Sequence, residues 1–226
     1  MRCIIIGAGP SLFENKHLEI LKRSDYEGVL IVPEVMAVRA LEAGITPDKF
    51  KNYYIATLED SWVTKDLMDY PIVKQWGKEI TAIVSARAPD VTRDYCKDTF
   101  KDVLLIERPE VWQISNNGLF MYTVAYNDLE VDEVCLIGMD HATNEHEFCA
   151  ISRDSEIYKN AFKEITNPET GKTVIMNPIQ QFWRIQFLHY VNKIYNKVKL
   201  VNCTQGGALF GENIKSMRFV EWLALS

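Results

Sequence analysis

The sequence has few of the features that mark three common classes of protein. No apolar run approaches the ~18 residues of a membrane-spanning helix. The five cysteines show no Cys-x-x-Cys spacing and are odd in number, which argues against a zinc site and a disulfide framework. The net charge is −6, whereas a dedicated nucleic-acid binder carries a basic footprint. We therefore expect no membrane span and no nucleic-acid partner.

Internal repeats, low-complexity segments and a targeting signal are also lacking. An apolar, strand-like run begins at Cys3, so we expect no signal peptide. Cys3 and Cys135 lie inside apolar runs and Cys203 lies just past one, which is typical of small core residues. Together with the missing disulfide pattern, these features predict a cytoplasmic protein in a reducing compartment.

The composition that is present is ordinary for a globular protein. Hydrophobic residues make up 47% and charged residues 25% of the 226 positions. A chain of this length buries roughly 70% of its unfolded surface, which is enough for a core without covalent staples. We expect a single domain over residues 1–226. The polar segment 142–178 has weak periodicity and is expected to be an insertion or lid.

Short apolar runs alternate with helical patterns along most of the chain. Strands are expected over residues 3–6, 29–32, 52–58, 81–85, 103–106, 134–137 and 199–201. Helices are expected over residues 17–23, 34–43, both ends of 64–76, 116–127, 179–198 and 214–223. This alternation predicts an α/β fold: a doubly wound, mostly parallel sheet with helices on both faces.

The stretch Gly7-Ala8-Gly9-Pro10-Ser11 follows the first expected strand. Glycines allow close approach of the backbone to a ligand, and Ser11 would cap the helix over residues 17–23. A strand, a glycine turn and a helix N-terminus together suit a phosphate group. The stretch lacks the third glycine of the dinucleotide fingerprint and the Lys-Ser/Thr of a P-loop. A tight turn without a ligand is therefore the alternative.

Further polar residues follow other expected strands or open the following helix. They are Glu59 and Asp60, Asn117 and Gly118, Asp140 and His141, and the turn from Asn202 to Gly207 with Thr204 and Gly206. The carboxyl ends of parallel strands meet at one edge of a sheet, which is where open α/β sheets bind ligands. The sequence therefore predicts one pocket lined by N–H donors, amides, carboxylates and an imidazole.

Two chemistries are open for this pocket. His141 would act as a general base, with its tautomer set by the carboxylate of Asp140, and His146 is a second candidate for the base. Alternatively, His141 only begins the insertion. Asp140, His141 and His146 do not match a zinc pattern. Asp60 or Glu59 would hold Mg²⁺ on a nucleotide's phosphates, or would be a solvated turn carboxylate.

Several of these motifs resemble one family, in the order in which the family carries them. They are Gly7-Ala8-Gly9-Pro10-Ser11-Leu12 with Asn15, Gly44-Ile45-Thr46-Pro47-Asp48, the strand to Asp60, Asn117-Gly118, Ile137-Gly138-Met139-Asp140 and Asn202-Cys203-Thr204-Gln205-Gly206-Gly207-Ala208. The group includes motility accessory factors of flagellin glycosylation and archaeal 6-hydroxymethyl-dihydropterin pyrophosphokinases. Its core is also similar to bacterial sialyltransferases that open with Gly-x-Gly-Pro-Ser-Leu.

The resemblance implies a Rossmann-like nucleotide site, with Gly7, Gly9 and Ser11 on phosphates and with Asn117, Asn202 and Thr204 on nucleotide or sugar. It implies transfer of a sialic-type sugar from a CMP donor with a histidine base, or Mg²⁺-dependent pyrophosphoryl transfer from ATP to a pterin. The third strand ends Leu58-Glu59-Asp60-Ser61, without the Asp-x-Asp-Gly of the pyrophosphokinases, which favours the glycosyltransferase. The chain is far shorter than the motility factors. Neither acceptor nor oligomeric state follows from the sequence.

Overall fold

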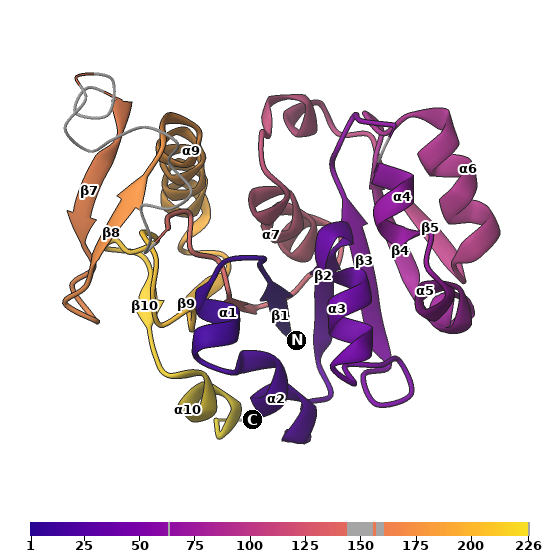
Figure 1. Cartoon of the computed structure of the whole chain (residues 1–226), viewed down its shortest axis with the longest axis horizontal. Helices are drawn as coiled ribbons and strands as arrows, with labels where there is room; N and C mark the ends of the chain where they lie inside the picture. The colour runs from indigo at the N-terminus through magenta and orange to yellow at the C-terminus, as the bar shows by residue number, and fades with distance from the viewer. Residues whose placement is uncertain (63, 144–155, 157–160, 226) are drawn as a thin grey trace.

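The computed structural model describes residues 1–62, 64–143, 156 and 161–225. Its centre is an eight-stranded sheet in the order β10-β9-β6-β1-β2-β3-β4-β5, and each neighbouring pair is parallel. The strands are β1 (Arg2–Ile6), β2 (Val29–Pro33), β3 (Asn52–Thr57), β4 (Thr81–Ser85), β5 (Asp102–Ile106), β6 (Glu133–Ile137), β9 (Lys199–Asn202) and β10 (Lys215–Ser216). Figure 1 shows β1 in the middle, with β2 to β5 on one side and β9 and β10 on the other.

The central strands are apolar on both faces because helices cover both faces. Alternate side chains of β1 enter two separate cores: Ile4 and Ile6 belong to one, and Cys3 and Ile5 to the other. This is how strands of a parallel sheet form near-continuous apolar runs. The two layers of helices and the all-parallel sheet confirm the α/β, Rossmann-like fold expected from the sequence.

Each face of the sheet has its own set of helices. The core of Ile4 and Ile6 is completed by α1 (Ser11–Glu14), α2 (His17–Arg23), η1 (Glu34–Met36), α3 (Ala37–Glu42), α4 (Thr64–Met68), α5 (Pro71–Trp76), α6 (Asp90–Thr99) and α10 (Phe219–Leu223). The core of Cys3 and Ile5 is completed by η3 (Pro109–Gln113), α7 (Asn117–Asn127) and α9 (Pro178–Ile194). Another short helix, η2 (Gly77–Glu79), precedes β4.

Two local expectations were wrong, and one helix was not expected. Ser11 does not cap the helix over residues 17–23, because α1 and α2 are separate and the N-cap of α2 is Lys16. The final helix begins only at Phe219, since Lys215–Ser216 extends the sheet as β10. Finally, α6 is a helix for which we had no expectation; its mean composition is polar, and only Thr92 and Cys96 are buried in it.

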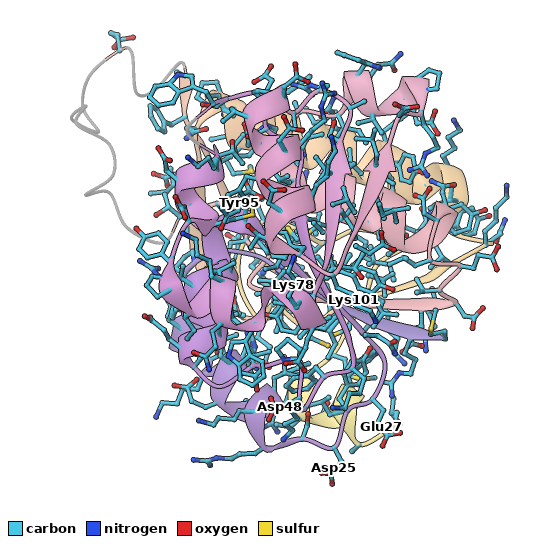
Figure 2. The ribbon with its side chains drawn as sticks, turned by 90° about the vertical axis from the view of Figure 1, so that its right-hand side faces the viewer. Asp25, Glu27, Asp48, Lys78, Tyr95 and Lys101 are labelled. Carbon is cyan, nitrogen blue, oxygen red and sulfur yellow. The ribbon has the colours of Figure 1, made fainter. Side chains whose placement is uncertain are left out.

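Figure 2 turns the β5 side of the molecule toward the viewer, where Lys78, Tyr95 and Lys101 lie. The hydroxyl of Tyr95 on α6 donates to the carbonyl of Met68 at 2.7 Å, and the ammonium of Lys78 donates to the carbonyl of Asp98 at 2.6 Å. These bonds join α6 to α4 and η2. Hydrogen bonds from long polar side chains to the backbone thus help to hold a helix of mostly polar composition.

Within the expected insertion, β7 (Lys163–Thr166) and β8 (Thr173–Met176) form an antiparallel hairpin. Figure 1 shows this hairpin beside α9, away from β2 to β5. Residues 144–155 and 157–160 lie outside the described part of the chain, so the lid role of 142–178 stays a prediction. Within the described residues, no helix is both long and apolar enough to cross a membrane.

Candidate functional site

The order of the strands places a switch point between β1 and β6. From β1 the chain builds β2 to β5 toward one edge, and it then returns to add β6 and β9 on the other flank of β1. Open α/β sheets bind ligands outside the carboxyl ends of the strands at such a point. Gly7 follows β1 and Gly138 follows β6, so the two loops expected to form a pocket begin side by side.

The glycine loop after β1 is packed directly against the loop after β6. The N–H of Gly7 donates to the carbonyl of Ile137 at 2.7 Å, and the N–H of Gly9 donates to that of Gly138 at 2.8 Å. A Cβ atom on Gly7 would lie 2.2 Å from the carbonyl oxygen of Gly138. A Cβ on Gly9 would lie 1.9 Å from Oδ2 of Asp140. Both glycines are therefore required by contacts inside the chain, whatever they bind.

Asp140 is the polar centre of the site. Its side chain is only 3% exposed, and its Oδ2 accepts the hydroxyl proton of Ser11 at 2.7 Å. Its Oδ1 is buried and has no hydrogen-bond partner among the described residues. Burial raises the pKa of Asp140 to about 6, although the bond from Ser11 opposes this rise. A buried carboxylate with a spare oxygen and a pKa near neutrality is a candidate for binding or proton transfer.

The turn after β9 completes this side of the site. The amide of Asn202 donates to the carbonyl of Leu209 at 2.6 Å and its Oδ1 accepts the N–H of Thr204 at 3.0 Å. The hydroxyl of Thr204 accepts the N–H of Met139 at 3.1 Å. Both side chains are buried and engaged by the chain itself, so they hold the turn against the β6 loop. Their expected contact with a nucleotide stays a prediction.

Gly206 and Gly207 bring the turn up to Asp140. A Cβ on Gly206 would lie 3.4 Å from Oδ1 of Asp140, and one on Gly207 would meet the backbone of Asp140 at 2.3 Å. On the far side, the amide of Asn167 donates to the carbonyls of Gly206 at 3.2 Å and Gly207 at 2.8 Å. The β7–β8 hairpin and the β9 turn are thus joined through one side chain.

Asn117 and Gly118 open α7 beside the ends of β2 and β3. The side chain of Asn116 caps the helix by accepting the N–H of Leu119 at 2.8 Å. The amide of Asn117 donates to Oε2 of Glu34 and to the carbonyl of Ala56 at 3.2 Å, while its Oδ1 is buried without a partner among the described residues. Asn117 therefore places an acceptor without a partner among the described residues at the carboxyl edge, and its contact with a nucleotide stays a prediction.

His141 occupies a strained position at the start of the expected insertion. Its φ is +48°, in the left-handed region that non-glycine residues seldom adopt, and Gln205 across the site has φ +57°. Its ring lies 5.6 Å from that of Phe187 on α9. Its Nε2 is buried without a partner among the described residues. Burial, with the charge of Arg184, lowers the pKa of His141 to about 4, so the imidazole is neutral at pH 7.

The hydrogen bond expected between Asp140 and His141 is not formed. The carboxylate of Asp140 bonds to Ser11 rather than to the imidazole of His141, so no carboxylate of the described residues fixes the tautomer of that ring. His146 lies outside the described residues. Asp60 is exposed and pairs with Arg87 at 3.4 Å. No group of three or more metal-ligating side chains occurs in the described part of the chain, and the role of Asp60 in holding Mg²⁺ stays a prediction.

Three residues of the site were missed from the sequence. Glu34 is buried at the end of β2, where the dinucleotide-binding fold places its acidic ribose ligand, and that position was the available signal. Burial raises the pKa of Glu34 to about 8. Arg184 and Asn167 reach the site from α9 and the hairpin. No local motif marks either residue, because their roles depend on how distant segments pack.

A comparison with solved structures identifies a protein of similar fold. A scan against models of known families and a search of curated proteins find no match. Among solved structures, the chain is similar to the MAf glycosyltransferase of Magnetospirillum magneticum AMB-1, with a TM-score of 0.69 and 19% sequence identity. The match covers 97% of this chain and 34% of that chain, so this chain spans about a third of its neighbour. At this identity, the likeness establishes a shared Rossmann-like α/β fold.

Proposed function

We propose that the chain is a nucleotide-sugar-dependent glycosyltransferase that uses a CMP-sugar donor. The observation that carries this proposal is the meeting of the Gly7–Ser11 loop, Asp140, His141 and the Asn202–Gly207 turn at the β1–β6 switch point. The fold shared with the MAf glycosyltransferase and the motifs that resemble motility accessory factors and sialyltransferases support it.

In this proposal, the acceptor hydroxyl attacks the anomeric carbon of the donor sugar. A glycosidic bond forms, the bond from that carbon to the phosphate oxygen breaks, and the nucleotide leaves with the electron pair. The proton of the acceptor hydroxyl passes to a base. His141 suits this role because its imidazole is neutral and Nε2 has no other partner among the described residues. Asp140 would position the donor through its unpartnered Oδ1.

A thermal-shift panel tests the choice of ligand. CMP or a CMP-sugar at about 100 times its Kd adds roughly 2.7 kcal/mol to the free energy of unfolding and raises the Tm. A shift with ATP that requires Mg²⁺, without any shift for CMP, would replace this proposal by the pyrophosphokinase. A shift with CMP but no turnover of any CMP-sugar would indicate a nucleotide-binding module without catalysis.

Histidine variants test the base. We expect H141A to lose about 100-fold or more in kcat, which is typical for removal of a general base. H189A is the matched control, since His189 is an exposed residue of α9. H146A tests the second candidate. Unchanged turnover by H141A with a loss in H146A would transfer the role of base to His146.

A further inference from the structure

Arg184 on α9 is a cation without a carboxylate partner among the described residues. Its Nε donates to the carbonyl of Ala208, and its Nη2 donates to the carbonyl of Phe210 at 3.3 Å. The ring of Phe210 lies 5.1 Å from the guanidinium carbon. Nη1 makes no hydrogen bond within the described part of the chain. This half-buried guanidinium is oriented by carbonyls and stacked on a ring, so it is fixed in place, and no carboxylate of the described residues compensates its charge.

This cation belongs to the candidate site through three contacts. Arg184 and Phe187 are three residues apart and so lie on one face of α9, and the ring of His141 packs on Phe187 at 5.6 Å. The charge of Arg184 acts on the imidazole of His141. Ala208, whose carbonyl holds the guanidinium, donates its own N–H to the carbonyl of Asp140 at 2.7 Å. Arg184 therefore faces the same loops as the candidate base.

We propose that Arg184 is the anion-binding residue of this site and that it binds the charged oxygens of the ligand beside His141. The ligand's anionic group is a phosphate or a sugar carboxylate, and guanidinium binds both through paired N–H donors. That this ligand is a nucleotide-sugar rests on the proposed function. The anion subsite itself rests on the uncompensated cation and its contacts.

The charge of Arg184 affects the pKa of His141, the candidate base. A bare cation beside His141 disfavours the imidazolium, together with burial. An anion bound to Arg184 neutralises that cation, so the pKa of His141 rises when the ligand binds. The imidazole then accepts the acceptor's proton more readily in the loaded site than in the empty one. Arg184 thus links occupancy of the anion subsite to the basicity of His141.

Binding measurements on R184Q test the proposal. Glutamine keeps a hydrogen-bond donor for the carbonyls but removes the charge. We expect R184Q to bind CMP about ten- to hundredfold more weakly than the wild type, because a charge-assisted hydrogen bond is lost, and to bind uncharged cytidine unchanged. R218Q is the control, since Arg218 is an exposed residue paired with Glu221. Weaker binding of a free sialic-type sugar acid alone would assign the subsite to the sugar carboxylate. Equal affinities of R184Q and wild type for both CMP and the free sugar acid would overturn the proposal.

A second measurement needs no variant of Arg184 and therefore does not depend on how that variant folds. The imidazole signal of His141 is assigned by its loss in H141A, and its pKa is followed by NMR in the wild type. A rise on adding inorganic phosphate or CMP assigns the subsite to the phosphate. A rise only with a free sialic-type sugar acid assigns it to the sugar carboxylate. No rise with any of these three anions overturns the proposal.

The two proposals fail separately. If no CMP-sugar is turned over but R184Q still weakens anion binding, the anion subsite stands and the glycosyltransferase does not. If the wild type transfers sugar while R184Q binds both CMP and a free sialic-type sugar acid normally, the glycosyltransferase stands and the anion subsite does not. R184K separates charge from shape: it keeps a point charge without the paired donors, so we expect an affinity between those of wild type and R184Q.

Discussion

At the scale of single residues, the site is organised by how close its backbone loops approach one another. Gly9, Gly206 and Gly207 all face Asp140, and each leaves room for its carboxylate or backbone. Within the described part of the chain, Ser11 is the residue whose side chain donates a hydrogen bond to that carboxylate. Oδ1 of Asp140 is therefore buried among backbone loops, without a hydrogen-bond partner among the described residues. A ligand atom would find there an acceptor already desolvated and fixed in direction.

The first prediction concerns this close approach. We expect G9A to lower the free energy of unfolding by about 2–4 kcal/mol, because the added Cβ would lie 1.9 Å from Oδ2 of Asp140. In the D140A background the two nearest atoms are gone, so G9A should cost less there. Urea unfolding of the wild type, G9A, D140A and the double variant gives the coupling energy between positions 9 and 140.

G211A is the control for this series, since the nearest atom to a Cβ on Gly211 is a Leu188 methyl at 3.4 Å. It should change the free energy of unfolding by less than about 0.5 kcal/mol. An equal cost of G9A with and without the Asp140 carboxylate would show that the clash lies elsewhere.

The second prediction concerns the buried acid at the end of β2. The pKa of Glu34 is raised from 4.5 to about 8 by burial, with a further contribution from Glu59. The folded protein then holds a proton that the unfolded chain releases, so the stability from this group is complete below pH 4.5 and is lost as pH rises through about 8. Between pH 6 and 8 the wild type should lose about 2 kcal/mol through Glu34.

The E34Q variant cannot ionise at this position, so that part of the pH dependence should vanish. Urea unfolding of wild type and E34Q at pH 6 and pH 8 measures it. E42Q, at an exposed position on α3, should keep the wild-type slope. Parallel slopes for wild type and E34Q would mean that Glu34 is already ionised in the folded protein at pH 6.

At the scale of elements, α9 connects the site to the rest of the fold. Its first turn is closed by a capping box, in which Asn177 accepts the N–H of Gln180 at 2.8 Å and Gln180 accepts that of Asn177 at 3.0 Å. Its middle carries Arg184 and Phe187, and its end packs in the core through Val191 and Ile194. The position of Arg184 thus depends on a helix that is fixed at both ends.

The third prediction tests this capping. We expect N177A to lower the free energy of unfolding by about 1 kcal/mol and to speed amide exchange in the first turn of α9, because the N–H of Gln180 loses its acceptor. N192A, at an exposed position of the same helix, should have little effect. Exchange in N177A that matches the wild type would contradict a role for the cap.

The regular elements of the sheet could be predicted, because their signals are local. Buried parallel strands form apolar runs such as Val29–Val32, and the helix after the second strand ends where Gly44 takes φ +85°. Elements fixed by distant contacts could not be predicted. The polar α6 is held by hydrogen bonds to η2 and α4, and β10 exists only because Lys215 pairs with Val201 of β9.

In the candidate site, too, the features with local signals could be predicted and those fixed by distant contacts could not. That Gly9, Asp140 and Gly206 lie together follows from strand ends meeting at one edge, and the structure confirms this. The use of each side chain did not follow. Ser11 was expected to cap a helix and instead bonds to Asp140, and Arg184 was not expected at all. A helix residue carries no sequence mark of which loop it will face.

At the scale of the whole molecule, the two ends of the chain close on each other, and Figure 1 shows both termini near α10 and β1. The guanidinium of Arg2 lies 3.6 Å from the ring centroid of Trp222 and donates to its carbonyl at 2.7 Å. The indole N–H of Trp222 donates to Glu133 on β6 at 2.5 Å. The final helix therefore locks the amino ends of β1 and β6, opposite the site.

The fourth prediction tests this closure. Trp222 is completely buried, so W222A should lower the free energy of unfolding by about 3–5 kcal/mol. W112A is the control. Trp112 is 62% exposed, so W112A should change the free energy of unfolding by less than about 0.5 kcal/mol. Chemical denaturation followed by circular dichroism measures both. A small effect of W222A would mean that α10 is dispensable for the sheet.

The strand order around the switch point between β1 and β6 also determines the order in which the two sides of the site are synthesised. β1 is made well before its partner on one flank, which begins at Glu133, and the turn beside the site follows Asn202. A ribosome-bound chain that has reached α7 holds β1 with one flank unpaired and apolar. Such long-range pairing is slow and leaves strands open to wrong partners. The loop after β1 therefore meets the β9 turn only after almost 200 further residues have been made, up to Asn202.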